Sequence, residues 1–202
     1  MVIGVVDYGM GNLRSVLNAL ERLGAECRLV RDARELDAVD RAVLPGVGAF
    51  GDGMRELAER GFTEALPDYV ARGRPLLGIC LGMQLLGTLS HEHGQHAGLG
   101  IIPGEVRYID TDPALRIPHV GWNELCVGRT SRLLDGLDDV PMFYFVHSFE
   151  LHPDDPGAVT GTADYGRPIT ASVEHENAYG VQFHPEKSQR CGLRVIENFL
   201  AL

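Results

Sequence analysis

The sequence predicts an α/β fold: an open, largely parallel twisted sheet with helices on both faces and an antiparallel extension. In the first half, short apolar runs typical of buried strands alternate with longer segments of helical periodicity. From Gly98 onward, short apolar runs are separated by Gly, Pro and Asp, a pattern typical of antiparallel strands joined by turns. No repeat, low-complexity tract or linker interrupts the 202 residues, so one domain is predicted over residues 1–202.

The first half is predicted to form right-handed βαβ units. A buried strand over residues 2–7 leads into a helix that Asn12 caps and that ends near Leu23. The other elements predicted here are strands at 27–30 and 42–44, helical segments within 50–72 interrupted at Gly61 and Pro67, a strand at 76–79 and a helix at 81–89.

The second half is predicted to extend this sheet with a mixed, more antiparallel set of strands. A final amphipathic helix is predicted over roughly residues 188–201. The strand candidates of the second half, all before this helix, lie near residues 105–109, 143–149, 158–163, 169–175 and 178–183.

Composition excludes several classes of function. The formal net charge of −10 argues against binding to nucleic acid over a broad surface. No apolar stretch is long enough to cross a bilayer, and residues 1–7 run into a strand rather than a signal peptide. The four cysteines, at positions 27, 80, 126 and 191, lack the paired spacing of zinc sites or redox motifs. Scattered reduced thiols are typical of cytosolic enzymes, so a cytoplasmic protein is predicted.

The most informative motif is a cysteine placed where a buried strand turns sharply into a helix. Residues 78–82 read Gly-Ile-Cys-Leu-Gly, which is the G-x-nucleophile-x-G elbow with Cys80 as the nucleophile. Glycines flank such a nucleophile because its turn is strained and the neighbouring strand and helix leave no room for a Cβ. The turn also places Cys80 at a helix N-terminus, where the dipole favours a thiolate. A buried structural cysteine is the alternative for the motif taken alone.

A nucleophile needs a base, and His184 is the candidate. It follows the strand predicted at 178–183, at the carboxyl end where open α/β sheets carry their active sites. Pro185 fixes the turn, so Glu186 can come back alongside the imidazole and hold its tautomer. His-Pro-Glu alone is a weak motif, but together with the Cys80 elbow it predicts a Cys-His-Glu triad.

Two other motifs suggest a metal or a cofactor and support neither. Residues 91–96 read His-Glu-His-Gly-Gln-His, but loop histidines this close rarely form a defined site without distant ligands. Gly9-Met10-Gly11 is not a dinucleotide fingerprint, because Arg14 occupies the place of the third glycine. The sequence therefore predicts neither a metal nor a cofactor.

The elbow and residues 183–186 (FHPE) together resemble the class I, triad-type glutamine amidotransferases. Further stretches, in family order across nearly the whole chain, resemble one branch, the glutaminase subunits of imidazole glycerol phosphate synthases. These stretches are residues 7–12 (DYGMGN), 44–50 (LPGVGAF), 117–123 (IPHVGWN) and 144–149 (YFVHSF). The resemblance implies the class I glutamine amidotransferase fold, with glutamine as the small-molecule substrate.

The resemblance also implies roles for residues outside the triad. The oxyanion hole would take an N–H from Val47 or Gly48 beside that of Leu81, although a plain strand-to-helix turn is the local alternative at 46–48. The resemblance also implies that Gln84 contacts the substrate, and the local alternative is that Gln84 is a helix residue facing solvent. The substrate contacts that the resemblance implies are Gln84, Glu92, Val146, His147 and Ser148. Two departures from the family pattern are the histidines around Glu92 and Phe149, which stands where a tyrosine is usual.

The chemistry implied is glutamine hydrolysis through a Cys80 thioester, in which His184 protonates the departing ammonia and then activates water. The resemblance implies a heterodimer with a (β/α)8-barrel cyclase subunit, to which the ammonia passes for synthesis of imidazole glycerol phosphate in histidine biosynthesis. Lys187 is the only lysine in the chain, which suggests a specific place for its compact ammonium. The candidates for the partner-facing surface are Met10, Asn12, Trp122 and Lys187.

Two other functions remain open at the level of sequence. One is the glutaminase of another complex, such as pyridoxal phosphate synthase, against which the stretches at 44–50 and 117–123 count. The other is a non-catalytic binding or chaperone-like relative that keeps the elbow without turnover. The complete set of Cys80, His184 and Glu186 argues against the second alternative.

Overall fold

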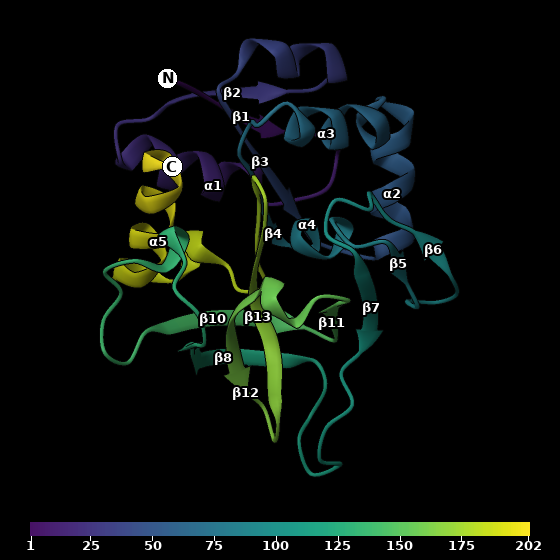
Figure 1. Cartoon of the computed structure of the whole chain (residues 1–202), viewed down its shortest axis with the longest axis vertical. Coiled ribbons are helices and arrows are strands. Elements are labelled where there is room, and N and C mark those ends of the chain that lie inside the picture. Colours follow the sequence, from purple (N-terminus) through teal and green to yellow (C-terminus); the bar gives the residue numbers. More distant parts are fainter.

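A twisted sheet of eight strands crosses the molecule in the computed structural model, which describes residues 1–202 (Figure 1). Its strands run in the order β2-β1-β3-β4-β14-β13-β12-β9, and the first five are mutually parallel. The last three pair antiparallel, so the predicted fold class, a largely parallel sheet with an antiparallel extension, is confirmed. In sheet order the strands are β2 (Glu26–Val30), β1 (Val2–Val6), β3 (Arg41–Gly46), β4 (Leu76–Cys80), β14 (Ala178–Val181), β13 (Pro168–His175), β12 (Val159–Asp164) and β9 (Cys126–Val127).

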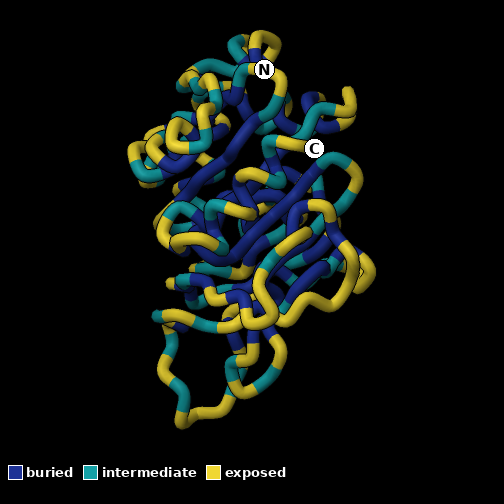
Figure 2. The backbone as a smooth tube through the Cα atoms, turned by 90° about the vertical axis from the view of Figure 1, so that its left-hand side faces the viewer, coloured by how far each residue is buried: buried dark blue, intermediate teal, exposed yellow.

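Helices cover both faces of this sheet. On one face, α1 (Leu13–Arg22) and α5 (Gln189–Ala201) share a buried apolar cluster with β1, β4 and β14. On the other face, α2 (Phe50–Glu59), α3 (Phe62–Ala71) and α4 (Leu81–Leu85) share a second cluster. Figure 2 shows the central strands as buried segments between partly exposed helices. The chain thus buries two separate cores, one on each side of the parallel strands.

Two smaller sheets lie beside the antiparallel end of the main sheet. One is the two-stranded antiparallel ribbon of β8 (His119–Glu124) and β10 (Met142–His147). The other sheet has four strands. Four short 3₁₀ turns complete the structure. The four strands are β11 (Phe149–Pro153), β7 (Gly104–Tyr108), β5 (Leu89–Ser90) and β6 (His96–Ala97). The 3₁₀ turns are η1 (Ala33–Ala38), η2 (Arg132–Leu134), η3 (Pro156–Ala158) and η4 (Pro185–Lys187).

Two predictions at the level of elements were wrong, and several strands, β8 among them, were not predicted. Pro67 does not interrupt its helix, because burial of Leu66 and Tyr69 against the sheet outweighs the hydrogen bond that a proline cannot donate. The helix predicted over 81–89 ends at Leu85, because residues 89–90 pair with β7 as β5. The strand β8 was missed because its apolar residues Val120 and Trp122 point to solvent, the reverse of the usual alternation.

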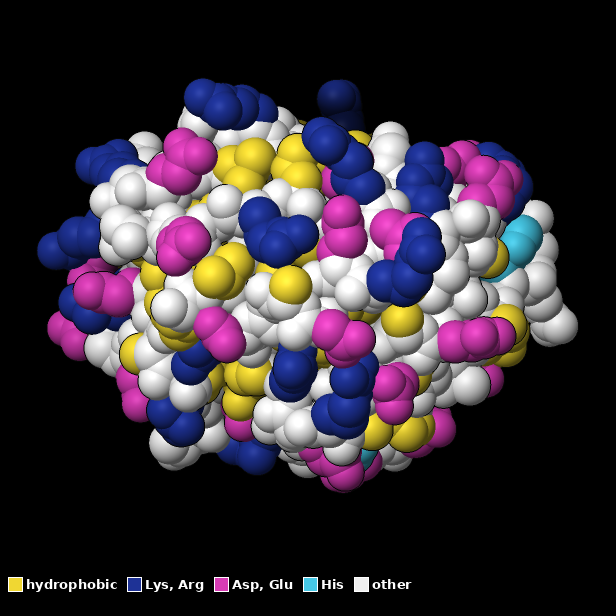
Figure 3. Space-filling model, turned by 90° about the horizontal axis from the view of Figure 1, so that it is seen from above, with side chains coloured by type: hydrophobic (Ala, Val, Ile, Leu, Met, Phe, Trp, Pro, Cys, Tyr) yellow, Lys and Arg dark blue, Asp and Glu magenta, His cyan; other side chains and the backbone are white.

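The remaining predicted helices and the long strands are confirmed within a few residues, including the Asn12 cap, whose Oδ1 accepts a hydrogen bond from Ser15 N. Acidic and basic side chains are interspersed over the face seen in Figure 3, so this face carries no extended patch of one sign. None of the helices is both long enough and apolar enough to traverse a bilayer.

Candidate active site

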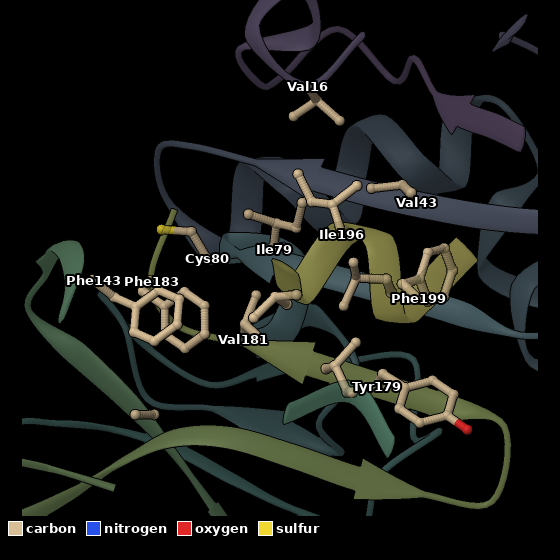
Figure 4. Packing of buried hydrophobic residues seen from close by; sticks show 14 of the residues in the cluster. Val16, Val43, Ile79, Cys80, Phe143, Tyr179, Val181, Phe183, Ile196 and Phe199 are labelled. Atoms are coloured by element: carbon tan, nitrogen blue, oxygen red, sulfur yellow. The ribbon is translucent and has the colours of Figure 1, made fainter. Parts of the chain in front are cut away.

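Cys80 is the last residue of β4 and the residue that precedes α4, so it occupies the turn that the sequence predicts. Its backbone has φ 55° and ψ −112°, a conformation that is strained for any residue with a side chain. Figure 4 shows Cys80 at the end of the packed cluster, beyond Ile79. The residue is 7 % exposed, so its thiol is sheltered yet reachable. The elbow is therefore present as geometry as well as sequence.

The glycines on either side of Cys80 are required by close packing. A Cβ on Gly82 would lie 1.8 Å from the carbonyl oxygen of Leu44, in the neighbouring strand β3. A Cβ on Gly78 would lie 2.6 Å from the carbonyl oxygen of Gly82. Both distances are far below van der Waals contact with backbone atoms, which cannot move aside as a flexible side chain can. The two glycines thus allow β3, β4 and α4 to meet tightly around the thiol.

His184 and Glu186 form the hydrogen-bonded pair that the sequence predicts. The Nδ1–H of His184 donates to Oε1 of Glu186 over 2.8 Å, and both side chains are 2 % exposed. The backbone N–H of His184 donates to the carbonyl of Tyr144, and its own carbonyl accepts from the Ser188 hydroxyl. With Nδ1 held by the carboxylate, Nε2 is the nitrogen left for chemistry, and it has no hydrogen-bond partner.

Opposing influences act on the pKa of His184. Burial lowers it, but the adjacent Cys80 and the Glu186 carboxylate outweigh burial and raise the pKa to about 9. The imidazole is therefore held in its protonated form at neutral pH. A protonated imidazole is the form that can donate a proton to a leaving group.

Cys80 and His184 open into one cavity of about 640 Å³. This volume is in the range of pockets that bind small molecules. The structure brings together there all the residues predicted for the nucleophile, base, oxyanion hole and substrate contacts, and Glu186 lies behind His184. The predicted residues lining the cavity are Val47, Gly48, Cys80, Leu81, Gln84, Glu92, Val146, His147, Ser148 and His184.

The turn after β3 lines this cavity with two residues whose backbone N–H groups are unpaired. The backbone N–H groups of Val47 and Gly48 donate to no backbone carbonyl. Gly48 has φ 102°, and a Cβ there would lie 2.8 Å from Cε of Met10. The carboxylate of Glu92 accepts a 2.6 Å hydrogen bond from the N–H of Phe50, which holds residues 91–96 against the start of α2. The turn thus offers the unoccupied N–H groups that an oxyanion hole requires.

Gln84 is buried, so the alternative of a solvent-facing helix residue is wrong. It is 5 % exposed, and its Nε2 donates both to the carbonyl of Phe149 at 3.0 Å and to Oε1 of Gln182 at 2.9 Å. Gln182 in turn places its Nε2 3.7 Å from the sulfur of Cys80. Sequence reasoning missed Gln182, whose only signal is a glutamine inside an apolar strand. The pair connects the thiol to the strand that carries Phe149.

The four candidates for a partner-facing surface lie outside the cavity. Trp122 is 46 % exposed on the β8–β10 ribbon, and its ring contacts that of Tyr144 at 6.2 Å between centroids. The ammonium of Lys187 lies 5.7 Å from the centre of the same Tyr144 ring. Met10 and Asn12 are on the loop before α1, beside the turn at Gly48. Cavity residues to which the sequence analysis assigned no role in the site are His93, Tyr108, Pro118 and Phe149.

We expect Glu186→Gln to lower both the rate of turnover and the pKa of His184. Burial lowers the pKa of His184, and Glu186 is one of the two groups that raise it. Loss of the carboxylate therefore lowers this pKa from about 9. An amide can also stabilise the wrong tautomer of the imidazole. The analogous change in a serine triad lowers kcat about 10⁴-fold. Titration of the His184 ring by NMR and steady-state kinetics measure the two effects. An unchanged pKa would contradict the role assigned to Glu186.

Comparison with known proteins gives the family. The family described as Glutamine amidotransferase class-I matches residues 4–202. The chain is 47 % identical over 203 residues to "Imidazole glycerol phosphate synthase subunit HisH" of Syntrophotalea carbinolica, covering 98 % of both chains. It is also 47 % identical over 196 residues to the protein of the same name from Aquifex aeolicus, covering 96 % of this chain and 94 % of that one.

Solved structures share the fold at low sequence identity. A structure of PurLQS from Thermotoga maritima superposes with a TM-score of 0.79 at 22 % identity, covering 99 % of this chain and 97 % of that one. A glutamine amidotransferase structure gives a TM-score of 0.78 at 23 % identity, covering 100 % and 98 %. These likenesses support the class I glutamine amidotransferase architecture of the sheet and helices.

Proposed function

The chain belongs to the class-I glutamine amidotransferase family, as a glutaminase subunit of the imidazole glycerol phosphate synthase type, and from this premise we propose how its residues act. Cys80 is the nucleophile, His184 the proton donor and base, and Glu186 the carboxylate that orients His184. The observation that carries this assignment is that the strained Cys80 turn and His184, whose Nε2 has no hydrogen-bond partner, line one cavity.

The proposed reaction begins with attack of the Cys80 thiolate on the side-chain carboxamide of glutamine. The tetrahedral oxyanion is stabilised by the N–H of Leu81 and by an N–H from Val47 or Gly48, which are otherwise free of backbone partners. His184, protonated at neutral pH, gives its proton to the departing nitrogen, which leaves as ammonia. The products of this step are ammonia and a γ-glutamyl thioester on Cys80.

Hydrolysis of the thioester completes the cycle. His184 has lost its proton, so its Nε2 accepts one from a water molecule that attacks the thioester carbonyl. The tetrahedral intermediate then expels the thiolate and releases glutamate. In this proposal the backbone of residues 146–148, together with Gln84 and Glu92, holds the amino-acid end of the substrate within the cavity.

The same proposal includes transfer of ammonia to a (β/α)8-barrel cyclase subunit, in a heterodimer that makes imidazole glycerol phosphate for histidine biosynthesis. The relatives carry the name of a synthase subunit, which supports a synthase partner. The outer face of the β8–β10 ribbon supports the location of the contact, because apolar side chains are exposed there beside the cavity. These side chains are Val120 (55 % exposed), Trp122 (46 %), Met142 (37 %) and Val146 (36 %).

A cytoplasmic location is part of the proposal. Its support is that all four cysteines are unpaired, with Cys126 exposed, which is typical of a reducing compartment.

We expect stimulation of glutamate release by a cyclase barrel and its nucleotide, and loss of that stimulation in Trp122→Glu. A charge on the apolar ribbon face opposes burial against the partner, so the stimulated rate at limiting cyclase falls about tenfold or more. Val127→Glu is the matched control, because Val127 is equally exposed, at 48 %, on the edge strand β9 of the main sheet. Glutamate release is measured with and without the cyclase.

The outcomes of this experiment separate the alternatives. Stimulation by a pyridoxal phosphate synthase barrel instead of the cyclase would assign the chain to that complex. No turnover with either partner would indicate a binding module that keeps the elbow without catalysis. An equal loss of stimulation in Trp122→Glu and Val127→Glu would rule out the ribbon face as the docking surface.

A further inference from the structure

The β8–β10 ribbon has two faces of different character. In its antiparallel register, Val120 pairs with Val146 and Trp122 with Tyr144, and these side chains share the outer face. His119 and His147 pair with each other in the same register. Their side chains share the inner face, and they are only 3 % and 6 % exposed. Two buried histidines therefore lie directly behind the apolar face.

A continuous chain of hydrogen bonds crosses the inner face. Nδ2 of Asn123 is 3.3 Å from Nε2 of His119, and Nδ1 of His119 is 3.0 Å from Nε2 of His147. Nδ1 of His147 is 2.8 Å from the carbonyl oxygen of Phe149. The chain therefore begins on β8 and ends on the backbone that follows Ser148, at the wall of the cavity.

The groups at the two ends of this hydrogen-bond network, the Phe149 carbonyl and the Asn123 amide, fix which atom donates in every bond. The carbonyl of Phe149 only accepts, so Nδ1 of His147 carries the proton and its Nε2 accepts from His119. His119 then donates from Nδ1 and accepts at Nε2 from the amide of Asn123. The orientation of that amide is set at its other atoms, because Oδ1 accepts from Glu124 N and Nδ2 also donates to the Asp164 carbonyl.

This arrangement requires both rings to be neutral. Burial lowers the pKa of each histidine to about 4, and the backbone carbonyl bonded to His147 only partly offsets it. His119 is further held by its ring neighbours, with centroids 4.8 Å from Phe145 and 4.3 Å from Tyr165. All the polar atoms of the chain are thus satisfied and its members are locked in one arrangement.

We propose that His119 is a positioning residue for glutamine binding. Through the hydrogen bond that it donates to His147, it sets the backbone of residues 147–149, to which the proposed function assigns the amino-acid end of glutamine. The inference rests on that proposed function. His119 does not line the cavity, so it acts only through His147, and Asn123 acts through His119.

The hydrogen-bonded network of Asn123, His119 and His147 lies directly behind the face that we propose for the partner. Its first member, Asn123, follows Trp122 on the same strand, and the side chains of the two residues project to opposite faces of the ribbon. A shift of β8 on docking therefore changes the geometry of the chain on its inner face.

The test compares His119→Phe with His119→Asn in the complex with the cyclase. Phenylalanine keeps a ring between Phe145 and Tyr165 but cannot donate to His147, whereas asparagine can place an N–H donor near the position of Nδ1. We expect His119→Phe to raise KM for glutamine about tenfold, the value of one buried hydrogen bond, with kcat changed less than about twofold. His119→Asn is expected to restore most of the affinity.

Direct binding separates this inference from the proposed function. Glutamine affinity is measured by calorimetry in the Cys80→Ala complex, with and without each His119 substitution, so the result does not depend on turnover. A tenfold loss with Phe and recovery with Asn supports the inference. An unchanged affinity with Phe, or equal losses with both substitutions, overturns it while leaving the glutaminase assignment standing. Absence of glutamine binding in the Cys80→Ala complex itself would overturn both.

Discussion

Replacing Cys80 with alanine is expected to abolish glutamine hydrolysis, with a loss of about 10⁴-fold or more in kcat with the cyclase present. The reason is that the proposed mechanism has no other group that can form the thioester, because it assigns only proton transfer to His184 and only orientation of His184 to Glu186. Losses of this size follow removal of the nucleophile in hydrolases with comparable triads. Glutamate release in the complex is the measurement.

The fold should survive this substitution. Alanine adds no atoms at a turn whose strain arises from the residue's φ of 55°, and the flanking glycines are retained. Cys126→Ala is the matched control, because Cys126 is an exposed thiol on β9, remote in the sheet order from β4. Full activity in Cys126→Ala and none in Cys80→Ala would assign the chemistry to one sulfur. Residual turnover in Cys80→Ala above about 1 % would contradict a thioester mechanism.

The geometry of the proposed triad could be predicted from sequence because its signals are local. Gly78, Cys80 and Gly82 lie within one turn, and the glycines are needed for contacts that a Cβ would prevent at 2.6 Å and 1.8 Å. His184 and Glu186 are two residues apart, and Pro185 between them fixes their approach. The parallel strands were also predictable, because strands buried on both faces are apolar along their whole length.

The residues that sequence reasoning missed depend on register. Gln182 reaches Cys80 only because β14 pairs with β4 in one specific alignment, in which Val181 is opposite Ile79. His119 reaches His147 only because β8 pairs with β10, and β8 itself was missed. Pairing between strands far apart in the chain leaves no periodic trace in a single sequence, so such contacts are not visible there.

The exposed apolar residues of β8 show where the usual alternation of a half-buried strand fails. The pattern of residues 119–124 places Val120 and Trp122 outward and His119 and Asn123 inward, the opposite of an ordinary half-buried strand. The inward polar atoms are accommodated because each has a hydrogen-bond partner. The outward apolar ones are explained by the partner that we propose, so an inverted strand pattern is itself a signal of an interface.

Replacing Gly82 with alanine is expected to destabilise the fold by about 3 kcal/mol or more and to reduce activity in whatever protein remains folded. The added Cβ would lie 1.8 Å from the carbonyl oxygen of Leu44, so β3 and α4 must separate by more than an ångström. Leu44 lies two residues before the turn at 46–48, and Gly82 directly follows Leu81. The displacement therefore falls between the two sets of proposed oxyanion donors, Leu81 on one side and Val47 or Gly48 on the other.

The matched control is Gly128→Ala, because Gly128 has an ordinary φ and the nearest atom to its Cβ would be the Thr160 carbonyl oxygen at 4.0 Å. Its unfolding free energy should change by less than about 0.5 kcal/mol. Urea unfolding of both variants gives the stabilities, and kcat of the Gly82→Ala complex, measured where that variant is folded, should fall about 100-fold, as expected for a misplacement near 1 Å. Wild-type stability in Gly82→Ala would mean that α4 can move away from β3 freely. In that case the tight contact between Gly82 and Leu44 would not be what holds the donors in register with the thiol.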